Sequence, residues 1–148
     1  TAELRKLLAI EGHESTFALA PHLLHLAASL GDKECCRVLL AFGYAIDEQD
    51  ETGATPLIAA ITRQHERQIV PSKPFKGEPE RAADALETCR FLLEQGADPC
   101  IADLRRQTPL HHAASSWPGD LVWLLLDHGA VVDRRDSAYR TPLHWAAE

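Results

Sequence analysis

The chain has 148 residues, of which 45% are hydrophobic and 25% are charged, and its formal net charge is −7. This length and composition are typical of one globular domain, and apolar runs such as residues 121–126 are far too short to cross a bilayer, which argues against membrane insertion. The acidic charge argues against nucleic-acid binding, because that affinity comes from Lys and Arg side chains that neutralise phosphates.

The first predicted element is a helix within residues 1–21. In the segment LRKLLAI, Leu4, Leu7 and Leu8 have the spacing of one helical face. We expect this face to pack on the segment that follows. Residues 1–21 are therefore predicted to form an N-terminal capping helix or a degenerate copy of the units described next.

From residue 22 onwards the sequence repeats itself. The segment HLLHLAASLG begins at His22, and clearer copies begin at Thr55 (TPLIAAIT), Thr108 (TPLHHAASS) and Thr141 (TPLHWAAE). His22 and Thr55 are 33 residues apart, as are Thr108 and Thr141, and a Leu-Leu pair followed by glycine closes each complete unit. The pattern predicts units at 22–54, 55–107 and 108–140. A further unit starts at 141–148; we expect its second half to lie beyond Glu148, or its helix to be left partly exposed.

Each unit has the pattern of a turn, a short helix, a second turn and a longer helix. Thr108 suits an N-cap, and Pro109 suits the first helical position, where a missing N–H does no harm. In the second helix, the segment LVWLLL carries a broad apolar stripe, and Gly129 supplies a left-handed stop. Neither helix buries its apolar face alone, whereas stacked units do.

The unit 55–107 contains about 20 additional residues, which fall within 64–84, between its two helical patterns. Pro71, Pro74 and Gly77 prevent a continuous helix, so we expect a loop on helical stalks. One interpretation is a tolerated surface insertion, because loop-closure entropy grows slowly with length. The other is a second docking site centred on Lys73, Phe75 and Lys76.

The 33-residue period and the recurring TPLHxA signature resemble the ankyrin repeat family from about His22 to Glu148. The resemblance implies an all-α solenoid of stacked helix-turn-helix units whose long turns project as fingers. It also implies that His25, His111 and His144 tie each helix start to the adjoining turn by hydrogen bonds. Ile58 takes this position in the unit that begins at Thr55.

The chemistry-bearing residues do not form an enzyme signature. No Gly-rich phosphate loop, GxSxG or HExxH segment occurs, and stacked units place equivalent histidines along a ladder rather than around one point. We therefore expect no catalytic site, metal, cofactor or small-molecule substrate. The four cysteines lack metal or redox spacing, which favours a reducing, intracellular setting, cytoplasmic or nuclear.

The resemblance assigns binding to the concave face and the fingers, and the finger residues differ in charge along the chain. We count net charges of −4, 0 and +1 for the charged residues of the three fingers in chain order. Asp50, Asp103 and Asp136 recur in phase and are expected to bond nearby backbone. The predicted partner-binding residues are Asp47, Glu48, Asp50, Glu51, Leu104, Arg105, Arg106, Arg134, Arg135, Tyr139 and Arg140.

Two of these residues, Arg106 and Tyr139, stand where the first finger has Gly53. A residue with a Cβ fits poorly where φ is positive, so we expect these two turns to be reshaped. Both residue types are common interface anchors. Trp145 is expected to be a half-buried packing residue.

The sequence therefore predicts a non-catalytic protein-interaction module, the adaptor or targeting part of a larger intracellular protein. Its acidic end is expected to meet basic residues of a partner, and its arginine-rich end acidic ones. The alternative is a regulatory domain that controls or positions an enzyme or channel in the same polypeptide. For any single finger charge, the competing interpretation is a solvated residue or a pair between neighbouring fingers.

Overall fold

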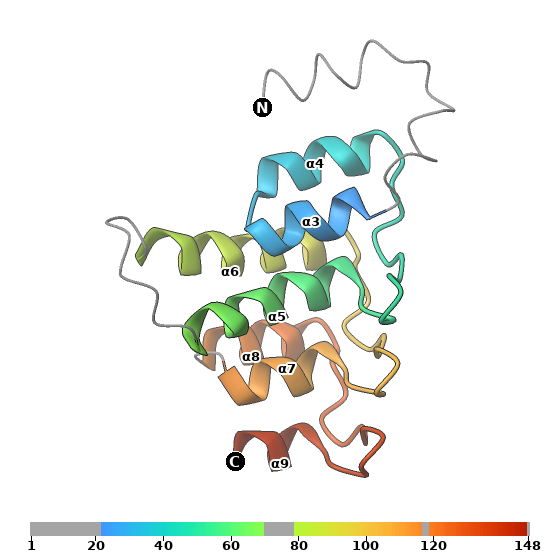
Figure 1. Cartoon of the computed structure of the whole chain (residues 1–148), viewed down its shortest axis with the longest axis vertical. Helices are drawn as coiled ribbons and strands as arrows, with labels where there is room; N and C mark the ends of the chain where they lie inside the picture. The colour runs from blue at the N-terminus through green and yellow to red at the C-terminus, as the bar shows by residue number, and fades with distance from the viewer. Residues whose placement is uncertain (1–21, 70–78, 117–118, 148) are drawn as a thin grey trace.

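The computed structural model describes residues 22–69, 79–116 and 119–147 (Figure 1). The helix predicted within 1–21 and the possible second site at Lys73, Phe75 and Lys76 lie outside the described residues. In the described part, all regular structure is helical. The helices are α3 (Leu23–Leu30), α4 (Lys33–Ala41), α5 (Pro56–Ile69), α6 (Pro79–Glu94), α7 (Pro109–Ser116), α8 (Gly119–Asp127) and α9 (Pro142–Ala146).

The helices form two layers that run along the long axis of the molecule. Helices α3, α5, α7 and α9 stack on one another in the first layer, and α4, α6 and α8 stack in the second (Figure 1). Each first-layer helix from α3 to α7 also packs on the second-layer helix that follows it in the chain. The all-α solenoid of stacked helix pairs is thus confirmed.

The helix boundaries follow from local sequence. The hydroxyl of Thr55 accepts a hydrogen bond from the Ile58 backbone N–H at 3.3 Å, which satisfies one of the free donors at the start of α5. At the end of α8, Gly129 has φ +90°, and the backbone N–H of Ala130 returns to the Leu125 carbonyl at 3.0 Å. The predicted left-handed stop at Gly129 is confirmed.

The core is continuous from α3 to α8, because each unit buries its apolar stripe against the next. The fully buried side chains include Leu24, Leu57, Ile61, Leu92, Leu121 and Leu125. The small residues Ala28, Ala60 and Ala113, one each from α3, α5 and α7, are fully buried as well. The thiols of Cys36 and Cys89 belong to this core, and burial raises both pKa values to about 12. These cysteines therefore remain protonated and act as small apolar side chains.

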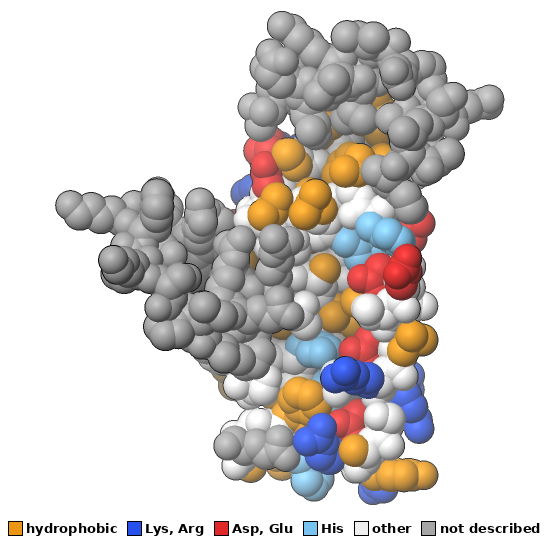
Figure 2. Space-filling view, in the orientation of Figure 1, with side chains coloured by type: hydrophobic (Ala, Val, Ile, Leu, Met, Phe, Trp, Pro, Cys, Tyr) orange, Lys and Arg blue, Asp and Glu red, His pale blue; other side chains and the backbone are white. Residues whose placement is uncertain are grey.

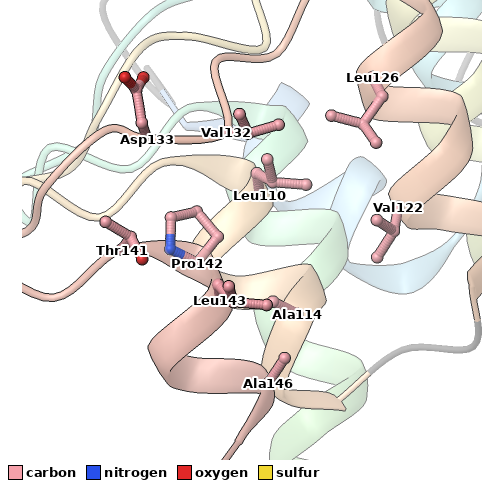
Figure 3. Close-up of a pocket in the computed structure, with 10 residues that line it drawn as sticks. All are labelled: Leu110, Ala114, Val122, Leu126, Val132, Asp133, Thr141, Pro142, Leu143 and Ala146. Atoms are coloured by element: carbon pink, nitrogen blue, oxygen red, sulfur yellow. The ribbon is translucent and has the colours of Figure 1, made fainter.

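The α9 end of the stack has an open apolar groove of about 480 Å³ between α7, α8 and α9. Figure 3 shows Val122 and Leu126 on one side of it, and Leu143 and Ala146 on the other. Leu143 is 77% exposed, whereas Leu110, the equivalent residue one unit earlier, is 3% exposed. The groove therefore has the lining of a helix-packing surface.

Candidate functional site

The three fingers, which we define as residues 45–54, 98–107 and 131–140, project on one side of the stack (Figure 1). Each is closed by an aspartate whose Oδ1 accepts backbone N–H groups two and four residues later. The donors are Thr52 and Ala54 for Asp50, Arg105 and Gln107 for Asp103, and Ala138 and Arg140 for Asp136, all at 2.8–3.0 Å. The predicted turn role of these aspartates is confirmed.

Neighbouring fingers are bonded to each other along the stack. The Leu104 N–H donates to the Thr52 carbonyl at 3.0 Å, and the Ser137 N–H donates to the Arg105 carbonyl at 2.9 Å. Side chains add to this ladder: Gln49 Nε2 donates to the Ala102 carbonyl at 3.1 Å, and Asp47 accepts the Asp98 N–H at 3.0 Å. The fingers therefore form one connected edge rather than three separate loops.

The signature histidines join this edge to the helices. His111 Nδ1 accepts the Thr108 N–H at 3.1 Å, so its Nε2 carries the proton that is donated to the Arg140 carbonyl at 3.1 Å. His25 makes the equivalent bond to the Ala54 carbonyl at 2.9 Å. Burial lowers the pKa of His111, although the Arg140 carbonyl and Asp136 oppose this effect. The structure gives His25 and His111 the role that the resemblance implied, and His144 Nδ1 accepts the Thr141 N–H at 3.2 Å.

The turn aspartates also reach the first-layer helices through Oδ2. Asp103 Oδ2 lies 3.2 Å from His112 Nε2, and Asp136 Oδ2 accepts Trp145 Nε1–H at 3.1 Å. Asp136 also pairs with Arg140 Nε at 3.2 Å, and the Arg140 guanidinium lies 4.7 Å from the centroid of the Trp145 ring. Burial alone raises the pKa of Asp136, but hydrogen bonds from the Arg140 backbone, Trp145 and the Ala138 backbone outweigh it and hold the pKa low.

His112 and Trp145 thus belong to the finger surface, although the sequence pointed to neither as a contact residue. Each is held nine residues after a turn aspartate, and each carries a ring N–H. In the unit that begins at Thr55, Ala59 stands at the corresponding position and offers no donor. Trp145 is half-buried, as expected.

Four of the five arginines in the second and third fingers remain available to a ligand, whereas Arg140 is held by Asp136. Arg105, Arg106, Arg134 and Arg135 are all exposed, and none of their side chains is in an ion pair within the described ranges. Asp103 and Asp136, two of the acidic residues in these fingers, are already engaged by backbone and ring N–H groups. Figure 2 shows Lys and Arg side chains gathered on the finger edge towards the C-terminal end, and acidic ones nearer the N-terminal end.

The other predicted contact residues divide into exposed and engaged ones. Leu104 and Tyr139 are 75% and 73% exposed at their finger tips, and Glu51 is exposed on the first finger. Asp47 and Asp50 are half-buried and bonded within the ladder, and Glu48 is half-buried. The acidic character that the first finger presents to solvent therefore rests on Glu48 and Glu51.

The expected reshaping of the second and third turns is wrong. Arg106 and Tyr139 adopt φ values of +60° and +63°, close to the +76° of Gly53. Their N–H groups bond the Asp103 and Asp136 carbonyls at 2.8 and 3.0 Å, as Gly53 bonds Asp50 at 2.9 Å. The left-handed conformation costs a residue with a Cβ about 1–2 kcal/mol, and the hydrogen bonds of the turn hold it in place.

Among the described side chains, no group of three or more His, Cys, Asp or Glu residues is placed to hold a metal ion. No described helix combines the length and apolar character that a membrane crossing requires.

Comparison with protein families gives two matches. The model for ankyrin repeats (3 copies) matches residues 2–70 and 81–148, and the model for a single ankyrin repeat matches residues 52–104.

Relatives with curated descriptions include ankyrin repeat and SOCS box protein 16 of Mus musculus, 32% identical over 133 residues and 84% of this chain. Inversin of Homo sapiens is 30% identical over 82% of the chain, and putative palmitoyltransferase ZDHHC13 of Danio rerio is 41% identical over 42% of it. The chain spans 25% of the first relative and 10% of each of the other two.

Proposed function

Because the chain belongs to the ankyrin repeat family, whose members are in general non-catalytic and interact with proteins, we propose that it binds a partner protein or peptide. The binding surface consists of the finger edge and the adjoining first-layer helices. We also propose that the chain divides into repeat units at 22–54, 55–107 and 108–140, and that a further unit begins at residue 141. The free thiols of all four cysteines are compatible with the proposed intracellular setting.

The single observation that carries this proposal is the set of exposed, unpaired arginines on a connected edge. Four guanidinium groups in two adjacent fingers have no counter-ion among the described residues. A planar guanidinium recognises carboxylates through two parallel hydrogen bonds. The backbone ladder fixes the fingers in advance, so little ordering of the main chain opposes binding.

The distribution of charge supports one orientation for the partner. Glu48 and Glu51 mark the first finger, whereas the arginines lie on the second and third. A partner segment with basic residues at one end and acidic residues at the other meets complementary charge in only one direction. Leu104 and Tyr139, at the finger tips, add apolar contact.

The experiment compares two double variants with equal changes in formal charge. Arg105→Glu with Arg134→Glu alters the fingers, and Arg37→Glu with Arg90→Glu alters exposed arginines of α4 and α6. Each protein is used to capture partners from cell lysate. We expect the finger variant to lose partners that the native chain and the second-layer variant retain. Equal capture by all three proteins contradicts the proposal.

A second candidate function is regulation of an enzyme in the same polypeptide. One matched relative carries the name of a putative palmitoyltransferase, and this chain aligns with only 10% of it. In this case the fingers contact another part of their own protein. The test is the activity of the parent enzyme with and without the finger substitutions. A change in that activity, while all external partners are still bound, favours this candidate.

A further inference from the structure

The exposed face of the second layer carries a repeated ion pair that is interrupted at α8. In α4, Glu34 pairs with Arg37 at 3.5 Å, and in α6, Glu87 pairs with Arg90 at 3.5 Å. At the corresponding positions of α8 stand Asp120 and Trp123. The carboxylate is retained, and an aromatic ring replaces its cation.

Trp123 is 68% exposed, which is unusual for the largest apolar side chain. Position 119 of the same helix is a glycine, and a Cβ there would lie 3.9 Å from both Cδ1 and Nε1 of the Trp123 ring. No side chain therefore covers this edge of the indole from position 119. In the part of the chain that the structure describes, no cation lies over the ring.

Two exposed carboxylates flank the ring on the same face of α8. Asp120 precedes Trp123 by three residues and Asp127 follows it by four, and these spacings bring side chains together on a helix. Neither carboxylate is in an ion pair among the described residues. On the adjacent helix α6, Glu87 and Glu94 occupy the equivalent exposed positions, and Glu87 is already paired with Arg90 and Lys33. An uncovered aromatic ring thus shares its face of α8 with two carboxylates, Asp120 and Asp127, that have no ion-pair partner among the described residues.

The molecule itself contains an example of the cation that such a surface attracts. Arg37 pairs with the carboxylate of Glu34 and places its guanidinium 5.6 Å from the centroid of the Phe91 ring, which belongs to the next second-layer helix. One guanidinium thus satisfies a carboxylate and a ring together. Trp offers a stronger cation–π partner than Phe.

We propose that Trp123, with Asp120 and Asp127, forms a docking site on α8, distinct from the fingers and from residues 73–76. This α8 site binds an arginine or lysine in a basic segment of a partner protein. The site lies on the second layer and uses none of the finger residues. Its ligand has the opposite charge from the one that the arginines of the second and third fingers attract. The chain can then hold two protein segments at once.

The experiment uses indole N–H signals in nuclear magnetic resonance spectra of the whole chain. The chain has three tryptophans, and the signal lost in Trp123→Arg identifies Trp123. This variant restores the acid–arginine pair of α4 and α6, so we expect it to fold with an unchanged melting temperature. The probes are a Gly-Ser peptide that carries three arginines and the same peptide with glutamines in their place.

We expect the arginine peptide to shift the Trp123 signal, with smaller or no shifts of the other two, and the glutamine peptide to leave it in place. Trp123→Arg should weaken binding about tenfold or more, and Asp120→Asn with Asp127→Asn about two- to fivefold. Equal shifts with both peptides, or undiminished binding by Trp123→Arg, overturn the proposal. The double variant Arg105→Glu with Arg134→Glu should bind the arginine peptide no more weakly than the native chain. The test of the Trp123 site is therefore independent of whether the fingers bind a partner.

Discussion

At the scale of single residues, the finger turns show how local strain and hydrogen bonding compete. The aspartate pattern could be predicted from the sequence because an Asx turn depends on neighbours two and four residues away. The prediction that the turns at Arg106 and Tyr139 are reshaped was wrong, because it was based only on the energetic cost of a positive φ. Two bonds to the aspartate carboxylate and one turn bond outweigh that cost in each finger.

Removing this strain should stabilise the protein. We expect Arg106→Gly and Tyr139→Gly each to raise the free energy of unfolding by up to about 1 kcal/mol, because glycine adopts positive φ without steric cost. Urea denaturation measures the change. Gly53→Ala is the reverse control: φ is +76°, and a Cβ there lies 2.8 Å from the Leu104 backbone nitrogen, so it should lower stability. A loss of stability in both glycine variants contradicts the strain argument.

His22 stands where the later units have a threonine, and in the next unit the Thr55 hydroxyl caps α5 by accepting the Ile58 N–H at 3.3 Å. His111 Nδ1 accepts from Thr108, whereas His25 Nδ1 is buried without a partner among the described residues. His22→Thr should therefore raise the free energy of unfolding by about 1 kcal/mol, the usual contribution of an N-cap. Thermal denaturation tests this expectation, with His22→Ala as the control that offers no hydroxyl. Equal stability of the two variants refutes the cap explanation.

The pH dependence of stability follows from His111. Burial lowers its pKa below the ordinary value of 6.5, so the unfolded chain takes up the proton first as the pH falls. His111 should therefore reduce the free energy of unfolding as the pH drops below about 6.5, with no effect above it. Urea titrations at pH 7.5 and 5.5 measure this loss. His111→Ile, which introduces the side chain that Ile58 has at the same position, should make the loss smaller; an unchanged pH dependence assigns it to other groups.

At the scale of elements, helix starts and stops were predictable because caps and left-handed stops are local. The Thr-Pro starts of α5, α7 and α9 and the stop at Gly129 all lie where the sequence indicated. Contacts between elements were not predictable in the same way. The bond from Asp136 to Trp145 exists only once a finger folds back on the next helix, and the exposure of Trp123 depends on the orientation of α8 in the stack.

The elements should also differ in local stability. α9 has five residues and packs on α7, and its Leu143 is 77% exposed, whereas α5 lies between α3 and α7 and also packs on α6. In a solenoid each unit is stabilised mainly by its neighbours. We expect backbone amides of α9 to exchange with solvent fastest among the described helices, and those of α5 near Leu57 and Ile61 slowest. Mass-spectrometric hydrogen exchange tests this order; equal protection of α5 and α9 contradicts it.

At the scale of the whole molecule, the 33-residue period predicted stacked units, because no unit buries its apolar stripe alone, and the resemblance to ankyrin repeats implied the all-α solenoid. The surface was harder to predict. The charged residues of the second finger sum to no net charge. Asp103, however, is bonded within its turn and to His112, while Arg105 and Arg106 are exposed and have no ion-pair partner among the described residues. Surface electrostatics thus depend on which carboxylates the fold itself uses.

The affinity of a captured partner, titrated against each variant at low and high salt, tests partner recognition by the finger arginines most directly. We expect Arg105→Glu with Arg134→Glu to weaken the complex by about tenfold or more and to reduce its salt dependence, because exposed charges are screened by salt. Arg37→Glu with Arg90→Glu should leave both quantities close to those of the native chain. If the two double variants bind equally well, or lose affinity equally, the finger arginines do not recognise the partner.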